Sequence, residues 1–192
     1  MCIRDSHYVV ADFLHVLHLM DLTRRSQCRG CQILCLASNL TDVTDVNFAA
    51  NSNLVKIAVW QNLGMTFRRS LWMEIKDCAY TFCNHDDYNW DWSLLAVSQK
   101  CMARELIAIV SLAPRVFHLG QCGVHFKSNN CHNTSTLAAL RVTLEAATNH
   151  LFPEKLSVTS SDSEPTKELI VNGGWGDVRD QQLCLKIATT ES

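Results

Sequence analysis

Apolar residues recur along much of this chain at the spacings of helices and strands, and short polar stretches separate them. Apolar positions three or four apart predict helices at residues 12–22, 67–77 and 135–149. In the first of these helices, Val16 and Met20 fall on one side. The third begins with a serine that can cap its first turn.

Short apolar runs bounded by polar or glycine-containing stretches predict strands. These strands are expected at residues 33–36, 54–60, 107–110 and 115–118. The polar stretches 38–53 and 157–166 are expected to form loops. Strands that alternate with helices indicate an α/β layer, although the strands are too few for a complete doubly wound sheet. No repeat and no clear second domain are evident.

The totals are those of an ordinary globular domain. A chain of 192 residues is long enough for one domain with a sizeable core. Its residues are 47% apolar and 19% charged, which is ordinary for a globular protein. The formal net charge is −2 and the basic residues are scattered, so neither nucleic acid nor an anionic membrane is an expected partner. No signal peptide or membrane span is visible, because the apolar stretch 9–11 is short and is followed by Asp12.

Ten cysteines are many for a cytosolic protein of this length. Cys28 and Cys31 form a CxxC pair, but a zinc site would require a second such pair, and the chain has none. A redox CxxC motif is usually followed by the start of a helix, and no helix is expected directly after Cys31. Disulfides in an oxidising compartment are therefore the favoured interpretation. The glycosylation sequons at Asn39 and Asn133 also fit a secretory route. Because a secreted protein needs a signal and none is visible, we expect the true N-terminus to be missing.

The most informative stretch is residues 85–92, His-Asp-Asp-Tyr-Asn-Trp-Asp-Trp. Carboxylates beside aromatic rings suit the binding of a sugar, with one carboxylate able to accept a proton from a hydroxyl. The same residues also suit a helix start, in which Asp and Asn cap amides and the rings enter the core. By itself the stretch leaves both interpretations open.

Three long segments together resemble the N-acetylglucosaminyltransferase II family. The first is Thr-Phe-Cys at residues 81–83 followed by Asp-Asp-Tyr-Asn-Trp-Asp-Trp at 86–92. The second begins with Pro-Arg-Val-Phe-His at 114–118, and the third contains Asn-Gly-Gly-Trp-Gly-Asp-Val-Arg-Asp at 172–180. The likeness runs from about His7 to Cys184.

The resemblance implies the C-terminal part of a GT-A (Rossmann-like) glycosyltransferase domain that binds manganese. The family activity is an inverting transfer of GlcNAc from UDP-GlcNAc to the 2-hydroxyl of the α1,6-arm mannose of an N-glycan. Such a displacement needs a base that deprotonates the acceptor hydroxyl while the diphosphate departs from the opposite face. The family location is the Golgi lumen, with a membrane anchor that would lie in a missing N-terminal segment.

Matching positions imply roles for individual residues. Asp91 is expected to be the general base, and His118 to bind the manganese ion. Trp90, Asn62 and Tyr88 are expected to bind substrate, with Trp90 packed against the donor sugar.

The neighbouring residues Asp86 and Asp87 are expected to cap amides or to support the site, while His85 and His125 have no assigned role.

The resemblance also implies four disulfides. The implied pairs are Cys28 with Cys31, Cys78 with Cys101, Cys83 with Cys184, and Cys122 with Cys131. The bridge from Cys83 to Cys184 would tie the glycine-tryptophan tail to the catalytic segment. Cys2 and Cys35 are left over, and Cys35 is expected to be a buried thiol in a strand.

The chain departs from the family at its start. The family's acidic metal motif should lie immediately before His7, but Ser6 stands at the position of the metal-binding aspartate. We therefore expect residues 1–6 to be a non-native leader.

Residues 7–192 are expected to be part of a single GT-A catalytic domain whose nucleotide-binding half, stem and membrane anchor are missing. Such a chain should be inactive by itself. The alternative is a disulfide-rich glycan-binding module without catalysis.

Overall fold

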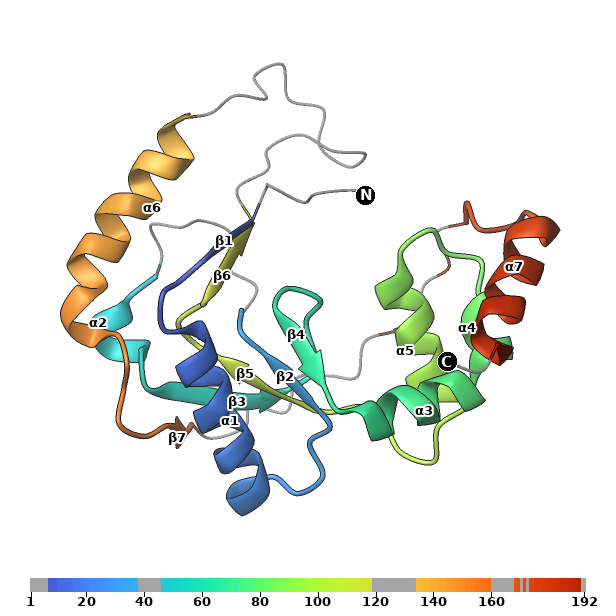
Figure 1. Cartoon of the computed structure of the whole chain (residues 1–192), viewed down its shortest axis with the longest axis horizontal. Coiled ribbons are helices and arrows are strands. Elements are labelled where there is room, and N and C mark those ends of the chain that lie inside the picture. Colours follow the sequence, from blue (N-terminus) through green and yellow to red (C-terminus); the bar gives the residue numbers. More distant parts are fainter. Residues whose placement is uncertain are drawn as a thin grey trace.

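A mixed five-stranded sheet, in the order β4-β2-β5-β3-β7, forms the centre of the larger part of the computed structural model (Figure 1). The structure describes residues 7–37, 46–118, 134–159, 168–169, 171 and 173–190. The strands of this sheet are β2 (Ile33–Cys35), β3 (Leu54–Ala58), β4 (Met65–Phe67), β5 (Ala108–Ser111) and β7 (Ser157–Val158). The helices are α1 (Phe13–Gln27), α2 (Phe48–Asn51), α3 (Arg69–Asp77), α4 (Ala79–Cys83), α5 (Trp90–Lys100), α6 (Thr134–Ala147) and α7 (Val178–Thr189).

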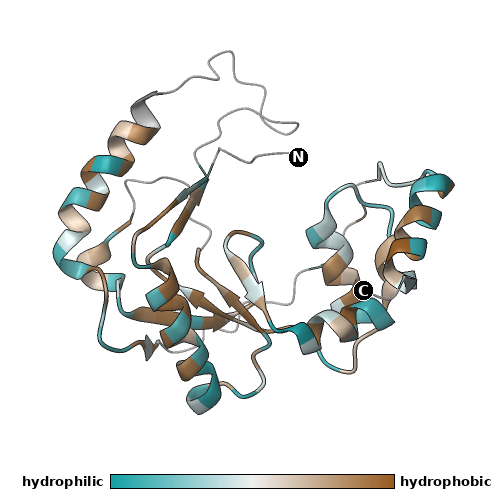
Figure 2. Ribbon diagram, in the orientation of Figure 1, coloured by the Kyte–Doolittle hydropathy of each residue, from teal (hydrophilic) through white to brown (hydrophobic). Residues whose placement is uncertain are grey.

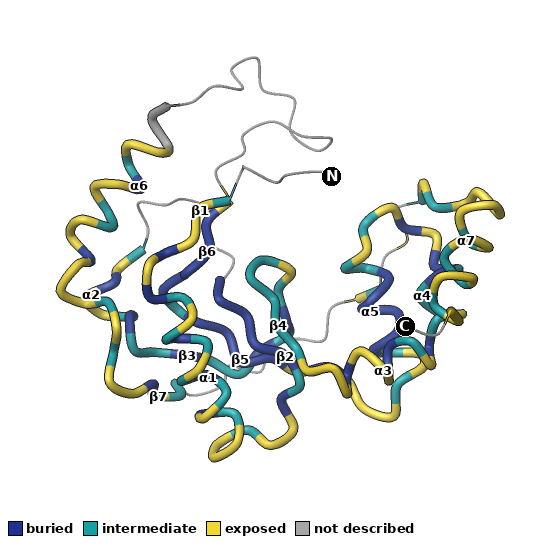
Figure 3. Tube along the Cα trace, in the orientation of Figure 1, coloured by how far each residue is buried: buried dark blue, intermediate teal, exposed yellow. Residues whose placement is uncertain are grey.

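The central strands β2 and β5 are buried on both faces, which explains their continuous apolar sequence (Figure 3). They run parallel, with Leu34 opposite Ile109, and β5 pairs antiparallel with β3. Side chains alternate across a strand, so Ile33 and Cys35 enter one core layer while Leu34 enters the other. The first layer also contains buried residues of α3 and α5, and the second contains buried residues of α1.

A second sheet has two antiparallel strands, β1 (His7–Val9) and β6 (Val116–His118). Its register places His7 opposite His118. Phe117 of β6 packs in a third core cluster with residues of α2 and α6.

Arg115, immediately before β6, is fully buried and is held by an ion pair. Its Nε donates to Asp12 Oδ1 at 2.8 Å, and its Nη2 donates to the carbonyl oxygen of Ser52 at 2.9 Å. The other Asp12 oxygen accepts a hydrogen bond from the amide of Phe152 at 3.1 Å. A buried charge is tolerated only when it is paired in this way. The pair therefore joins β6 to the start of α1.

Helices α3, α4, α5 and α7 lie together beside the sheet (Figures 1 and 2). We call residues 69–101 and 173–190 the helical part, and the remaining described residues, apart from 168–169 and 171, the sheet part. Helix α5 is the best buried of the four, while α7 buries none of its residues fully (Figure 3). Large apolar side chains of α7, such as Leu183 and Ile187, are exposed.

Three disulfides join Cys28 to Cys31, Cys78 to Cys101, and Cys83 to Cys184. These are three of the four implied pairs. The fourth, Cys122 with Cys131, lies outside the described residues, as do the sequon asparagines Asn39 and Asn133. Cys35 is a buried free thiol in β2, as expected.

The structure confirms the α/β class and the main buried strands, and it corrects several boundaries. Phe67 does not start a helix, because β4 pairs antiparallel with β2 before α3 begins. The expected loop 38–53 contains the short helix α2, capped by Asn47, and the expected loop 157–166 begins with β7.

Within the described residues, no helix is both long and apolar enough to cross a membrane.

Candidate active site

The acidic-aromatic run leads from the end of α4 into the first turn of α5. Asp87 is buried, and its Oδ1 accepts a hydrogen bond from the amide of Asn89 at 2.8 Å. Asp86 Oδ1 accepts one from the amide of Trp175 at 3.1 Å. Both carboxylates therefore support the backbone around the run, in agreement with the role expected for them.

Asp91 lies half-exposed in the first turn of α5, at a small pocket of about 80 Å³. Its Oδ2 accepts a hydrogen bond from Asn62 Nδ2 at 3.1 Å, and its Oδ1 accepts one from the amide of Trp92 at 3.2 Å. Asn62 belongs to the turn between β3 and β4, 29 residues away in the sequence. The structure thus brings two of the predicted site residues into direct contact.

The walls of this pocket combine apolar surface with a few polar groups. The pocket is lined by Val59, Trp60, Gln61, Asn62, Asp91, Trp92 and Leu95. Trp60 is buried, and its indole Nε1 has no hydrogen-bond partner within the part of the chain that the structure describes. A carboxylate and an amide beside apolar rings are suited to bind the hydroxyl groups of a sugar.

Tyr88 and Trp90 lie on the surface near the start of α5, with exposed fractions of 47% and 44%. Neither residue lines the pocket of Asp91, whereas Trp92 does. Tyr88 packs against Gly174, where an added Cβ would lie 3.3 Å from the Tyr88 ring. Its amide also donates to the carbonyl oxygen of Gly173 at 3.1 Å. Both rings are thus exposed outside the pocket of Asp91.

The glycine-tryptophan tail is bound along the acidic-aromatic run. The amide of Gly173 donates to the carbonyl oxygen of Asp86 at 2.9 Å, and Trp175 Nε1 donates to the carbonyl oxygen of Cys83 at 2.9 Å. The disulfide between Cys83 and Cys184 adds a covalent link. The predicted tie between tail and run is therefore confirmed, and its effect is to fix the backbone next to Asp91.

His118 lies exposed at the end of β6, with its ring centroid 4.9 Å from that of His7. His7 was not predicted as a site residue; it lies beside His118 only because of the β1–β6 register. Neither histidine lines the pocket of Asp91, and β6 lies in a different part of the molecule from α5 (Figure 1). The structure therefore does not bring His118 into contact with Asp91.

The described residues fit a manganese site only in part. Imidazole and oxygen ligands both suit manganese, and His118 offers an exposed imidazole. However, the described ranges contain no group of three or more His, Cys, Asp or Glu residues placed to hold a metal ion. Ser6 lies outside the described residues.

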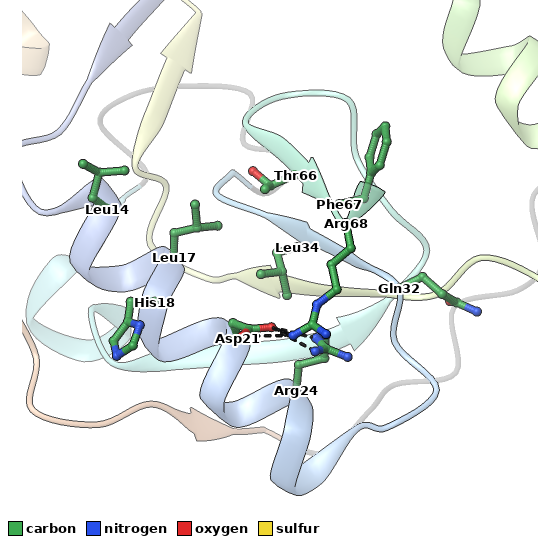
Figure 4. Close-up of a pocket in the computed structure, with 10 residues that line it drawn as sticks. All are labelled: Leu14, Leu17, His18, Asp21, Arg24, Gln32, Leu34, Thr66, Phe67 and Arg68. Atoms are coloured by element: carbon green, nitrogen blue, oxygen red, sulfur yellow. Dashed lines mark hydrogen bonds and ion pairs between the residues drawn. The ribbon is translucent and has the colours of Figure 1, made fainter. Parts of the chain in front are cut away.

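A larger cavity of about 380 Å³ lies between α1 and the β2–β4 edge of the sheet (Figure 4). At its centre, Asp21 accepts hydrogen bonds from Arg24, Arg25 and Arg68. Burial would raise the pKa of Asp21, but the hydrogen bonds from Arg25, Arg24 and Arg68 outweigh it and lower the pKa from 3.8 to about 2. None of the predicted site residues lines this cavity, and the cluster joins α1 to the end of β4.

Comparison with known proteins shows which family this chain resembles. A family model described as N-acetylglucosaminyltransferase II (MGAT2) matches residues 1–184. The alpha-1,6-mannosyl-glycoprotein 2-beta-N-acetylglucosaminyltransferase of Mus musculus is 34% identical over 191 residues, and the Homo sapiens protein of the same name is 32% identical over 191 residues. In both comparisons the match covers 95% of this chain and 41% of the relative. The Arabidopsis thaliana protein of that name is 25% identical over 191 residues, covering 97% of this chain and 43% of the relative. The chain thus spans less than half the length of these relatives.

Proposed function

Because the chain belongs to the N-acetylglucosaminyltransferase II family, we propose that it carries the general base of an inverting N-acetylglucosaminyltransferase. The proposed donor is UDP-GlcNAc, and the proposed acceptor is the 2-hydroxyl of the α1,6-arm mannose of an N-glycan. The fold would then be the C-terminal part of a GT-A domain, and the full-length protein would act in the Golgi lumen. No nucleic-acid partner is proposed.

The observation that carries this proposal is the setting of Asp91. It is half-exposed at a pocket with apolar rings, and both of its oxygens accept hydrogen bonds that orient the carboxylate. The neighbouring carboxylates Asp86 and Asp87 do not line this pocket, and Asp87 is buried. Asp91 is therefore the carboxylate of the run best placed to receive a proton.

In the proposed reaction, the acceptor hydroxyl oxygen attacks the anomeric carbon of GlcNAc and the bond to the diphosphate breaks. Asp91 accepts the hydroxyl proton during the attack. Asn62 donates to Asp91 at the same pocket, while Trp90 and Tyr88 offer exposed rings to the rest of the substrate.

His118 is the residue of this chain proposed to hold manganese, since an exposed imidazole is one of the ligands that this ion accepts. A bound divalent cation supplies positive charge that stabilises the departing diphosphate. The carboxylate ligand would have to come from residues other than those described.

The test is Asp91→Asn in a full-length protein that contains this chain. Loss of the base should lower kcat by about 100- to 10,000-fold while glycan binding is retained. Asp77→Asn, which changes an exposed carboxylate at the end of α3, is the matched control and should leave kcat unchanged. An Asp91→Asn protein with normal turnover would instead favour a glycan-binding module without catalysis.

A separate prediction concerns the 192-residue chain by itself. It should show no measurable transfer, because the donor-binding half is proposed to lie elsewhere in the full-length protein. Incubation with radiolabelled UDP-GlcNAc, manganese and an N-glycan acceptor measures this. Manganese-dependent labelling of the acceptor by this chain would contradict the prediction.

A further inference from the structure

We propose that the turn at residues 61–64 is a positioning element that holds the Asp91 carboxylate in its reactive orientation, with Cys35 as its anchor. The inference rests on the proposed role of Asp91 as the base. It gives Asn62 a role in orienting the base, in place of substrate binding, and it assigns a role to Cys35, the free buried thiol. Three hydrogen bonds from the end of β2, a tight glycine contact and one side-chain hydrogen bond carry it.

The first end of the turn is attached to β2 through Cys35. The thiol donates to the carbonyl oxygen of Gln61 at 3.2 Å, and the Gln61 amide donates to the same sulfur at 3.3 Å. Burial raises the pKa of the Cys35 thiol to about 12, so the group stays protonated and can both donate and accept. Gln61 is thus held on both its N–H and its C=O.

The other end of the turn is attached to the residue after β2. The amide of Leu36 donates to the carbonyl oxygen of Gly64 at 3.1 Å. Gly64 has φ +64°, and a Cβ there would lie 2.9 Å from both Leu36 Cβ and Val116 Cγ2. Glycine is therefore required by the backbone conformation and by the close packing. The same contact places the turn against β6, the strand that ends at His118.

Between these two anchors, Asn62 projects its amide to Asp91. The contact of 3.1 Å involves an exposed side chain, and an exposed hydrogen bond by itself restrains little. Here the backbone on both sides of Asn62 is fixed, so the amide is held at one position. Misplacement of a reacting group by about 1 Å can cost about 100-fold in rate, so fixing the carboxylate affects catalysis directly.

The test measures kcat and KM of variants in the full-length enzyme. Asn62→Ala should lower kcat by about 10- to 100-fold and leave KM within about twofold, because it misplaces the base without removing a substrate contact. Cys35→Ala should lower kcat by a smaller factor, and Cys35→Ser should restore it, since a hydroxyl also donates and accepts.

Ile33→Val serves as the control for packing in β2. It removes a buried methylene from the same strand without touching the turn, so it should lower the thermal midpoint while kcat is unchanged. A change of KM alone in Asn62→Ala would overturn the positioning role and support substrate binding. Equal kcat values in Cys35→Ala and the parent would overturn the anchor. Failure of the base assignment is distinguished by Asp91→Asn, which would then retain its turnover.

Discussion

The sheet part of the molecule is held by buried apolar strands and one buried ion pair, whereas the helical part is tied by two disulfides and its helix α7 buries none of its residues fully. Asp91 belongs to the helical part and Asn62 to the sheet part, so the candidate site lies where the two parts meet. The site therefore depends on both kinds of stabilisation, and each kind can be removed separately.

Breaking the buried ion pair should have the largest effect. Arg115→Met leaves the Asp12 carboxylate buried without its partner and should lower the free energy of unfolding by about 3–5 kcal/mol. Urea denaturation measures the change. Arg104→Met is the matched control, because its pair with Glu74 is exposed and 3.8 Å long, and should cost less than about 1 kcal/mol. Equal losses in the two variants would mean that burial of the pair is unimportant.

Removing the long-range disulfide should have a smaller effect, confined to the helical part. Cys83→Ser with Cys184→Ser opens a link between residues 101 apart and should cost about 2–4 kcal/mol. Amide hydrogen exchange should lose protection in α7 but keep it in β5. The control is Cys28→Ser with Cys31→Ser, which opens a link across only three residues and should change stability less. Equal loss of protection in β5 and α7 would show that the two parts unfold as one unit.

The smallest expected effect is the pH dependence from Asp21 in the sheet part. Its folded pKa of about 2 lies below its ordinary value of 3.8, so its stabilisation is present above the ordinary value and is lost as pH falls toward 2. Two of its three partners, Arg25 and Arg68, are largely exposed to solvent, which limits the contribution to about 1 kcal/mol. The stability difference between the parent and Asp21→Asn should therefore shrink between pH 5 and pH 2.5. A constant difference would contradict the assignment.

The sequence was informative wherever a segment is buried on both faces. The apolar runs that became β2 and β5 were predicted because these strands are buried on both faces, and β1 and β4 were missed because their side chains are partly or fully exposed. Such strands exist through pairing with a distant partner, and periodicity within the segment does not report that pairing.

The candidate site was predictable in its residue types and not in its contacts. The resemblance predicted roles for Asp91 and Asn62, and its implied pairing of Cys83 with Cys184 agrees with the structure. The hydrogen bond from Asn62 to Asp91 spans 29 residues and depends on a turn held by Cys35, a residue without an assigned function in the sequence. The role of His118 as a manganese ligand remains a prediction.

The most direct test of the central claim is the single-turnover rate of GlcNAc transfer by the full-length Asp91→Asn enzyme at saturating donor and acceptor. If Asp91 is the base, this rate falls by about 100- to 10,000-fold relative to the parent, because the acceptor hydroxyl keeps its proton during attack. A single-turnover rate equal to that of the parent and of Asp77→Asn would contradict the account.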